Sequence, residues 1–517
     1  MTNDLRYWAS EAPEQIAICI GTDSLTYGAL ESQANQLARV FQNLGLVRGD
    51  HIVALLPNTP FMFVVAWAAY RSGLYFTPAS SFLSVADAAY VIRNSQAKLV
   101  VASSGVKTSV VQLPSECPGH IHWVSDGCDL PGYSPVQIMM SHMSALPCDA
   151  ECAGSLMLYT SGTTGSPKGV WRPLPAADYK GTPAFAADLA MLFSLDRSVR
   201  YLSTAPLYHA APLRFALAVT AVGGTVFGMS KFDALQALEM LVRQKITHSQ
   251  WVPTMLQRLL RLPEEDRRKY FAPDHVMAVH AAAPCPLFVK RAMIDWWGPI
   301  LMEYYSGSEG VGLTMIDSHE WIGHPGSVGR ACKGIPHVLD DSWAELPAGE
   351  MGRIFFSGVT PFQYFGDPEK TAMRTSPQGY QTLGDIGYVD GEGYMYLTDR
   401  MDDMIISGGV NIYPQEIESA IMELPSILDV GVVGMADEAF GERPIAFVVG
   451  DSNMMPHEVA ALVGAHCAVR LGPIKTPARY LVLAQMPRSP TGKLLRRDLR
   501  DMLHGLSARA LSTEQID

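Results

Sequence analysis

Short apolar runs alternate with helical patterns through the first 250 residues of the chain. Residues 52–56 form an apolar run that is typical of a strand, and after a Pro/Asn turn residues 61–71 show a helical pattern. Further strand-type runs lie at residues 99–102 and 225–227. Strands that alternate with helices predict stacked α/β layers with largely parallel sheets.

The pattern changes between about residue 349 and residue 396. The turn pairs Asp390-Gly391 and Glu392-Gly393 separate short aromatic, β-rich runs there. Such hairpin-type turns predict a small, more antiparallel region that follows the stacked layers.

A separate unit begins after residue 403. Pro414 stands at the start of a helix that places Ile417, Ile421 and Leu424 on one face. Strand-type runs follow at 430–433 and 446–449, then a helix over 458–469 and a strand over 480–483. We therefore expect two domains, residues 1–400 and a smaller α+β domain of residues 401–517, with frayed final residues.

Composition indicates a globular protein of enzyme size. Of the 517 residues, 48% are hydrophobic and 17% charged, which is enough to build a large core. The net charge of −12 argues against non-specific nucleic-acid binding, which needs a basic surface. The eight cysteines are scattered without a Cys-x-x-Cys pair and indicate buried thiols in a reducing compartment.

No segment has the pattern of a membrane span or a signal peptide. The most apolar run, residues 52–70, is interrupted by Pro57 and Pro60. The first residues lack a basic stretch followed by an apolar one. We therefore expect a cytoplasmic protein.

The most informative stretch lies at residues 155–170, where an apolar run leads straight into a loop of hydroxyls and glycines. Small residues let backbone N–H groups approach an anion closely. Side chains that can add to such a site are those of Ser161, Thr163, Thr164, Ser166 and Lys168. A Walker A loop counted from Gly162 needs a glycine directly before Lys168, where Pro167 stands. The loop thus predicts a polyphosphate site of another kind, with a solvated turn as the alternative.

Four further positions are ambiguous when each is read alone. Glu309 closes a Gly/Ser loop, as a ligand of a hard cation does, or lies in a surface turn. Asp385 stands in a tight turn where a carboxylate can accept both hydroxyls of a ribose, or forms an Asx turn. Arg400 can bridge a nucleotide at the domain junction or belong to a salt-bridged linker, and Lys493 follows a Pro/Gly turn in which most lysines are simply exposed.

The order and combination of these motifs are specific. The sequence resembles the acyl-activating, adenylate-forming superfamily, and within it the acyl-CoA synthetases, over nearly its whole length. The resemblance rests on the loop at 159–169, Pro206-Leu-Tyr-His209, Ala281-Ala-Ala-Pro284, Glu309, Asp385, Arg400, Gly408-Gly409 and Lys493. It implies an α/β fold with a large N-terminal domain of stacked α/β sheets, a small β-rich subdomain and a mobile C-terminal α+β domain.

The resemblance also implies a reaction in two steps. A carboxylate attacks the α-phosphate of ATP to give an acyl-adenylate and pyrophosphate, and a thiol then displaces AMP. Two anions meet in the first step, so neutralisation of their charge should dominate catalysis. The implied cofactors are ATP, Mg²⁺ and coenzyme A as co-substrate.

Nucleotide-binding roles follow from the resemblance alone. The β- and γ-phosphates are expected against Thr160, Ser161, Gly162, Thr163, Thr164, Gly165 and Lys168. Mg²⁺ is expected on Glu309 together with Thr163 or Thr164. The remainder of the nucleotide is expected against Ala282, Tyr305, Ser308, Asp385 and Arg400, with Tyr305 beside adenine and Asp385 on the ribose.

The resemblance assigns the remaining roles to both domains. Lys493 is expected to bridge the substrate carboxylate and the α-phosphate, assisted by Arg400, and His209 is expected to act as a gate between nucleotide and acyl sites. Asp402 is the expected hinge of the mobile domain. Gly408 and Gly409 are expected to line the path of the pantetheine arm.

Three positions depart from the pattern of the family. Residues 305–309, Tyr-Ser-Gly-Ser-Glu, keep a hydroxyl but move the flexible glycine. Leu383 stands where a hydroxyl is common, which puts that contact to the nucleotide in doubt, and Asp399 replaces a commoner glycine. None of these changes removes a charge that the chemistry requires.

The expected acyl pocket favours a hydrophobic, bulky acid. Its residues are expected to be Tyr208, His209, Trp251, Ala281, Ser306, Gly307 and Gly312. The segments around them contain no Arg or Lys, so a second carboxylate on the substrate would lack a partner. An aryl, alicyclic, terpenoid or steroid-type, or long-chain acid is therefore expected.

Several alternatives stay open at the level of sequence. The acyl group can pass to a carrier protein or another acceptor instead of coenzyme A. The expected partners are small molecules, with no nucleic acid and no membrane span, and a homodimer is compatible with the sequence without following from it.

Overall fold

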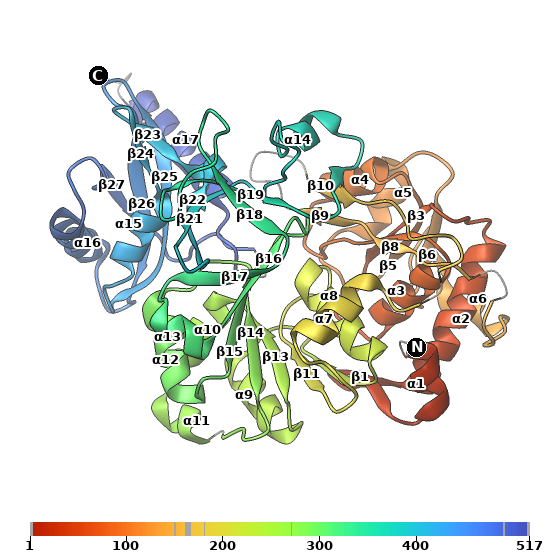
Figure 1. Ribbon diagram of the computed structural model, residues 1–517. Coiled ribbons are helices and arrows are strands. Elements are labelled where there is room, and N and C mark those ends of the chain that lie inside the picture. The colour runs from red at the N-terminus through yellow and green to blue at the C-terminus, as the bar shows by residue number, and fades with distance from the viewer. Residues whose placement is uncertain are drawn as a thin grey trace.

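The protein folds into a large N-terminal body and a smaller C-terminal one, as the ribbon of the computed structural model shows (Figure 1). The structure describes residues 4–148, 151–160, 167–179, 181–269, 271–489 and 492–513. The mixed α/β class and the two unequal bodies expected from the sequence are confirmed.

The first layer is a six-stranded parallel sheet in the order β7-β6-β5-β3-β4-β8. Its strands are β3 (His51–Leu55), β4 (Tyr75–Pro78), β5 (Ala97–Ala102), β6 (His122–Ser125), β7 (Ser134–Pro135) and β8 (Ser155–Leu156). Every residue of β3 is buried, which explains why this strand reads as a continuous apolar run. Helices of this part of the chain are α1 (Leu5–Glu11), α2 (Tyr27–Asn43), α3 (Phe61–Arg71), α4 (Val85–Asn94), α5 (Leu113–Glu116) and α6 (Val136–Ser141).

The second layer is a sheet of 13 strands that changes character along its width. Its parallel part contains β1 (Ile16–Ile20), β12 (Thr225–Gly228), β11 (Arg200–Ser203), β13 (His248–Trp251), β14 (Met277–His280) and β15 (Leu301–Tyr305), with β2 (Asp23–Thr26) antiparallel at the edge. The antiparallel part contains β16 (Leu313–Asp317), β17 (Ser327–Lys333), β22 (Met395–Arg400), β21 (Asp385–Val389), β19 (Gly352–Ser357) and β18 (Ile335–Leu339). The β-rich region predicted near residue 349 therefore continues the main sheet, and its antiparallel pairing already begins at β16.

Helices accompany the parallel part of this sheet. They are α7 (Ala184–Leu192), α8 (Ala210–Ala221), α9 (Ala234–Arg243), α10 (Pro253–Leu260), α11 (Glu264–Lys269) and α12 (Leu287–Trp297). Two short helices, α13 (Ser318–Gly323) and α14 (Pro368–Ala372), lie in the antiparallel region. A small sheet of β9 (Leu158–Thr160), β10 (Lys168–Trp171) and β20 (Gln363–Tyr364) brings segments some 200 residues apart in sequence together.

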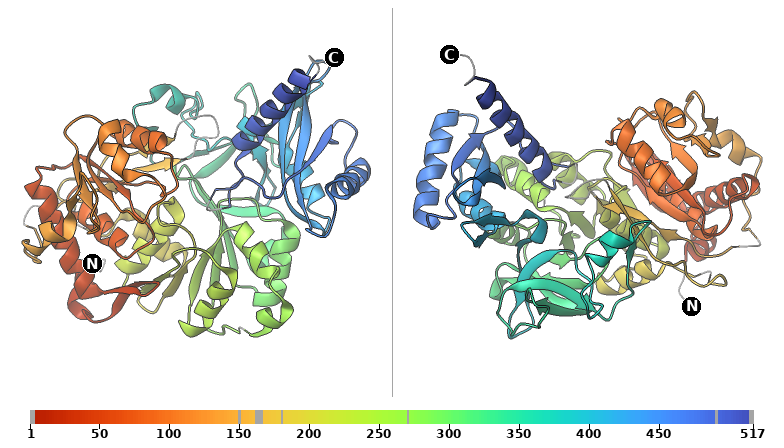
Figure 2. Two further views of the ribbon diagram at one scale, coloured as in Figure 1. Left: turned by 180° about the vertical axis from the view of Figure 1, so that it is seen from behind. Right: turned by 90° about the horizontal axis from the view of Figure 1, so that it is seen from above.

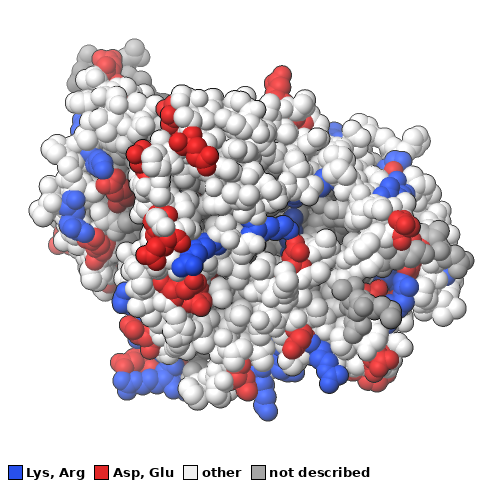
Figure 3. Space-filling view, in the orientation of Figure 1, with Lys and Arg blue, Asp and Glu red and all other residues white. Residues whose placement is uncertain are grey.

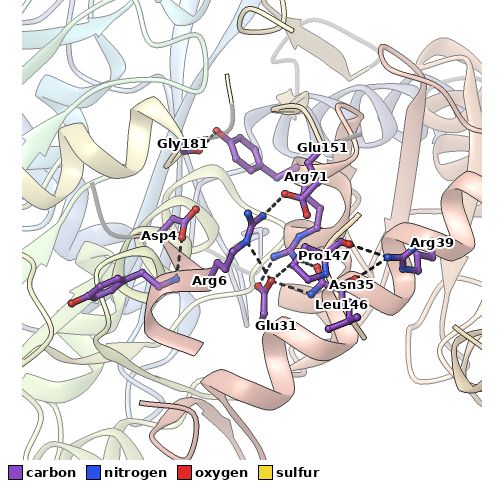
Figure 4. Close-up of polar contacts among 12 residues, drawn as sticks. Asp4, Arg6, Glu31, Asn35, Arg39, Arg71, Leu146, Pro147, Glu151 and Gly181 are labelled. Atoms are coloured by element: carbon purple, nitrogen blue, oxygen red, sulfur yellow. Dashed lines mark hydrogen bonds and ion pairs between the residues drawn. The ribbon is translucent and has the colours of Figure 1, made fainter. Parts of the chain in front are cut away.

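A buried ionic cluster holds the first three helices together (Figure 4). The Arg71 guanidinium, on α3, donates to the Glu31 carboxylate on α2 across 2.7 Å and also contacts Asn35. Arg6 on α1 pairs with Glu151. Removing one partner of such a buried pair typically costs about 3–5 kcal/mol, so the cluster fixes the positions of these helices.

The C-terminal body is built on a five-stranded sheet. Its elements are β23 (Ile405–Ser407), β24 (Val410–Ile412), α15 (Pro414–Ile421), β25 (Ile427–Asp437), β26 (Gly441–Gly450), α16 (Pro456–Arg470), β27 (Arg479–Val482) and α17 (Arg496–Thr513). Ile417 and Ile421 are buried against the sheet, as the predicted helix face requires. The predicted helix at 458–469 and strand at 480–483 correspond to α16 and β27 with bounds shifted by one or two residues.

The smaller body lies beside the antiparallel part of the main sheet, as the views from behind and above show (Figure 2). Arg261, which follows α10, donates to the carbonyl oxygen of Leu428 across 2.7 Å. Lys, Arg, Asp and Glu are interspersed on the face in Figure 3, without a large patch of one sign. None of the helices in the described parts of the chain is long and apolar enough to cross a membrane.

Candidate active site

The small sheet positions Lys168 at one side of the junction between the two bodies. Lys168 opens β10 and lies opposite Thr160, the last residue of β9. The loop between them, with the predicted residues Ser161, Gly162, Thr163, Thr164 and Gly165, lies outside the described residues. Burial lowers the pKa of the Lys168 ammonium, and the nearby charges of Arg374 and Lys370 lower it further.

Tyr364 links Lys168 to Glu309, a connection that the sequence did not reveal. Its ring centroid is 5.2 Å from the Lys168 Nζ, and its hydroxyl donates to Glu309 Oε1 across 3.0 Å. Tyr364 reaches this place because β20 pairs with β10. The pairing of strands this far apart in the chain leaves no local sequence signal.

Glu309 lies in the loop that follows β15. The Arg172 guanidinium holds this loop in place by donating to the carbonyl oxygens of Glu309 and Gly310. Among the described residues, no Lys, Arg or His lies within 4.0 Å of the Glu309 carboxylate. A carboxylate that already accepts one hydrogen bond, and lies near basic groups without an ion pair, has oxygen lone pairs free for a hard cation.

Asp385 and Arg400 lie opposite each other on the paired strands β21 and β22, and Tyr305 reaches them from β15, which β17 and β16 separate from β22 in the sheet. Arg400 ends β22 directly opposite Asp385, the first residue of β21, and its Nε is 3.4 Å from Asp385 Oδ1. The Tyr305 hydroxyl, at the end of β15, donates to Asp385 Oδ2 across 2.5 Å. Burial, followed by the charge of Asp385, raises the pKa of Tyr305 well above its ordinary value, so the phenol stays a donor.

Two of the departures from the family pattern, the glycine at position 307 and the leucine at position 383, pack against each other. A side chain at Gly307 would meet Leu383 Cδ2 at 2.5 Å and Glu309 Oε2 at 2.8 Å. Leu383 therefore occupies the space that a side chain at 307 would need. The glycine moved to position 307 and the apolar Leu383 fit each other, while Ser306 donates to the carbonyl oxygen of Gly312 across 2.7 Å.

Lys493 reaches this site from the C-terminal body. Burial lowers its pKa to about 8, the charge of Arg400 adds to that effect, and Asp403, Glu309 and Asp385 oppose it. Lys493 thus lies among the groups that the sequence placed around the nucleotide. Its loop is held by Arg488, which donates to the Gly492 carbonyl oxygen across 2.6 Å and pairs with Asp429.

His209 lies at the start of α8, near enough to Lys493 for the charge of the lysine to act on its imidazole. It is the N-cap residue of the helix, and its ring centroid is 4.4 Å from that of Tyr208. Burial lowers the pKa of His209 to about 4, and the charge of Lys493 adds to the shift. The imidazole is therefore neutral at pH 7, and its Nε2 is buried without a hydrogen-bond partner among the described residues.

The predicted acyl-pocket residues do not all face His209. Ala281 follows β14, and the next residue, Ala282, is exposed and adopts a left-handed φ of 78° that is unusual for alanine. Trp251 is buried and packs against Trp297, with its ring nitrogen donating to Ser249. Because side chains alternate along a strand, Gln250 points to the opposite face from Trp251.

The residues expected to serve as the hinge and to line the pantetheine path lie in two different places. Arg374 donates to Asp402 across 2.7 Å, so the predicted hinge residue is tied to the N-terminal body. Gly408 and Gly409 form the turn between β23 and β24, with left-handed φ values of 57° and 80°. This hairpin is at one edge of the five-stranded sheet, whereas the loop of Lys493 is tied to Asp429 on β25.

Comparisons with known proteins agree over almost the whole chain. The family described as AMP-binding enzyme matches residues 5–364, and the AMP-binding enzyme C-terminal domain matches residues 416–493. The long-chain-fatty-acid–CoA ligase FadD13 of Mycobacterium tuberculosis is 30% identical over 92% of this chain and 93% of its own. A Rhodococcus jostii CoA ligase, named for a methyl-dioxo-octahydroindenyl propanoyl group, is 28% identical over 96% of this chain and 97% of its own.

Solved structures show the same architecture. The O-succinylbenzoate coenzyme A synthetase of Bacillus subtilis, in complex with ATP and magnesium ion, superposes with a TM-score of 0.81. It is 25% identical and covers 97% of this chain and 99% of its own. With both domains matched in sequence and the architecture matched in structure, the chain belongs to the AMP-binding enzyme family.

Proposed function

We propose that the protein is an ATP-dependent acyl-CoA ligase that activates a hydrophobic carboxylic acid through an acyl-adenylate and releases AMP and pyrophosphate. Residues 1–400 form the adenylation domain, and residues 401–517 form the mobile domain that carries Lys493. The relatives named above support the reaction, since both are CoA ligases by name. The single observation that carries the proposal is the placement of Lys493 beside Arg400, His209, Glu309 and Asp385.

The lowered pKa of Lys493 fits a cation whose stabilising anions arrive with the substrates. Its charge is disfavoured because burial removes water and Arg400 lies near. A carboxylate and an α-phosphate would supply the missing negative charge on both sides. At 4 Å and an effective dielectric of about 20, one such unit charge is worth about 4 kcal/mol, which favours the encounter of the two reactants.

Other residues orient the nucleotide in this proposal. Asp385 accepts the ribose hydroxyls, Tyr305 lies against adenine, and Arg400 reaches towards ribose and phosphate. Ala282 and Ser308 contribute from the loops that follow β14 and β15. The neutral His209 marks the boundary between the nucleotide and the acid, where it presents no charge to either.

Glu309 suits Mg²⁺ brought in by ATP, because its carboxylate has no ion pair among the described residues. Thr163 and Thr164 remain proposed partners outside the described residues. The bound ion would offset phosphate charge, and Tyr364 holds the carboxylate in place for it. Lys168, whose ammonium lies over the Tyr364 ring, would add a second positive charge near the phosphates.

In the second step of the proposed reaction, the mobile domain turns about Asp402. Gly408 and Gly409, now at the edge hairpin, would then line the path of the pantetheine arm. Loss of pyrophosphate removes anions from around Lys493, and its buried charge then lacks partners, which favours its departure from the site.

A product assay tests the proposal directly. Purified protein is incubated with ATP, Mg²⁺ and a panel of aryl, alicyclic and long-chain acids, with and without coenzyme A. We expect acid-dependent pyrophosphate and acyl-AMP without coenzyme A, and acyl-CoA with AMP when it is added. Release of ADP, or no acid-dependent pyrophosphate with any acid, would overturn the assignment.

The same assay tests the alternative that the acyl group passes to an acceptor other than coenzyme A. If acyl-AMP persists in the presence of coenzyme A but is discharged by a phosphopantetheinylated carrier protein, the ligase acts on a carrier. Mass spectrometry of the thioester distinguishes the two products.

A further inference from the structure

One face of α8 borders accessible space while the rest of the helix is buried. His209, Ala210, Ala211 and Arg214 are partly exposed, and the other residues of the helix up to Ala221 are buried. Residues three and four positions apart share a helix face, so Arg214 continues the accessible stripe that begins at His209. Figure 1 shows α8 at the centre of the molecule beside α7.

Arg214 is a cation that forms no ion pair among the residues that the structure describes. Its Nε is buried and has no hydrogen-bond partner among the described residues. Its Nη2 makes one long contact, 3.5 Å, to the carbonyl oxygen of Ser308. None of the ion pairs in the described parts of the chain includes Arg214, and a desolvated guanidinium without a carboxylate is costly.

The surroundings of Arg214 combine hydrogen-bonding groups with an aromatic wall. Burial lowers its pKa to about 10, with Arg172 adding to the shift and Tyr304 and Glu309 opposing it. Tyr304 packs against Phe193 and Phe215, with ring centroids 5.8 and 6.0 Å away. The pKa of Tyr304 is raised by burial, while the charge of Arg214 and a hydrogen bond with Gln250 act against that rise.

Different basic groups act on Arg214 and on Lys168, although the loop of Ser308 and Glu309 lies near both. The charges that act on Lys168 include Arg374 and Lys370. Those that act on Arg214 come from Arg172, Tyr304 and Glu309. Arg214 also lies five residues beyond His209, about 7.5 Å along the helix at 1.5 Å per residue, on the stripe that leads away from the gate.

We propose that Arg214, with the Tyr304 hydroxyl and the Gln250 amide, forms a subsite for a second carbonyl or carboxylate oxygen on the acid. The subsite rests on the proposed ligase function and narrows its substrate class. The preferred acid is then apolar along its length but carries an oxygen acceptor at a distance from the reacting carboxylate. Arg214 lies outside the segments that the sequence placed around the acyl pocket, so the proposal adds a basic group that those segments lack.

Matched acids test the subsite. Octanoic acid, 7-oxooctanoic acid and octanedioic acid have the same chain length, and the last two carry an oxygen acceptor at or next to the far end of the chain. Acid-dependent pyrophosphate release is measured with each for the wild type and for Arg214→Met, Arg214→Lys and Arg197→Met. Arg197 is an exposed arginine outside the pocket and serves as the matched control.

We expect the wild type to favour the two acceptor-bearing acids over octanoic acid in kcat/KM. Arg214→Met should lower that ratio by tenfold or more, because the acceptor loses its partner. Arg214→Lys should retain part of the ratio, since it keeps the charge, and Arg197→Met should leave it unchanged. The melting temperature of each variant is measured alongside.

Three outcomes overturn the subsite. The wild type does not favour the acceptor-bearing acids, or Arg214→Met lowers the rates of all three acids by the same factor. The third is an unfolded Arg214→Met together with a folded Arg214→Lys that keeps no part of the preference. Failure of the ligase function itself is distinct, because then no acid of any kind would give pyrophosphate with the wild type.

Discussion

At the scale of single residues, Lys493 is the group on which the proposed first step depends most. Its ammonium lies beside His209 and Arg400 with no ion pair among the described residues. We predict that Lys493→Ala lowers acid-dependent pyrophosphate release about 100-fold or more, by analogy with the loss of one electrostatic donor. Thioester formation from supplied acyl-AMP should survive, and equal loss of both half-reactions would contradict this division.

The pKa of Lys493 gives a pH dependence with a definite sign. A pKa lowered to about 8 means that the ammonium is charged below that pH and neutral above it. The kcat/KM of adenylation reports the free enzyme and should therefore fall as pH rises through about 8. His209, with its pKa near 4, is neutral across this range. Discharge of supplied acyl-AMP should lack the alkaline fall, and a fall of the same size there would assign it to another group.

The sequence motifs alone predicted many of the residues of the candidate active site. Tyr305, Glu309, Asp385, Arg400 and Lys493 were all predicted from their motifs, and the structure brings these five near one another. Tyr364 and Arg172 were missed because each contacts a partner far along the chain. Strand pairing and helix packing create these contacts, and neither leaves a motif around the residue itself.

At the scale of elements, the loop that carries Lys493 fits closely against α10. Gly492 has a left-handed φ of 76°, and a side chain there would meet Thr254 Oγ1 at 2.0 Å. We predict that Gly492→Ala prevents this docking and lowers adenylation at least tenfold, because both the backbone strain and the clash oppose it. Discharge of supplied acyl-AMP, which does not need Lys493 in place, should be spared.

A control and a rescue make the test specific. Gly472→Ala introduces a methyl group where nothing lies within 4 Å and should leave adenylation unchanged. Adding Thr254→Ala to Gly492→Ala should recover part of the adenylation rate by removing the clashing oxygen. If the rescue has no effect, backbone strain alone explains the loss.

Elements as such were predictable where the sequence pattern was strong. Continuous apolar runs gave the buried strands, such as β3, and the spacing of Ile417 and Ile421 gave α15. The pairing partners of β10 were not predictable, since β9 lies beside it in sequence but β20 comes from nearly 200 residues later.

At the scale of the whole molecule, one of the contacts between the bodies is an ion pair of Asp402, the proposed hinge residue. Arg374 binds Asp402 across 2.7 Å, and both side chains are partly exposed. Such a pair is worth about 1 kcal/mol or less, which corresponds to a few-fold change in the balance between domain orientations. A weak tie suits the proposed turning of the C-terminal domain.

We predict that Arg374→Met raises the rate of proteolysis at the junction, residues 401–404, by about two- to fivefold in the absence of ATP. The physical reason is that Asp402, the proposed hinge residue, loses its ion pair with the N-terminal body. Lys475→Met, which removes a pair with Glu416 inside the C-terminal body, is the matched control and should not change junction cleavage. Equal cleavage of wild type and Arg374→Met would show that the pair does not hold the orientation.

The sequence by itself determined the reaction type and the α/β class, because both are carried by local signals. Glycines, hydroxyls and fixed charges mark the motifs, and apolar periodicity marks the elements. The tertiary structure decided which of these groups meet, and it revealed Arg214 on the stripe beyond His209. The physical reason is that the pKa and the binding role of a charged group depend on its neighbours and on its burial. Here those arise from pairing and packing between segments hundreds of residues apart.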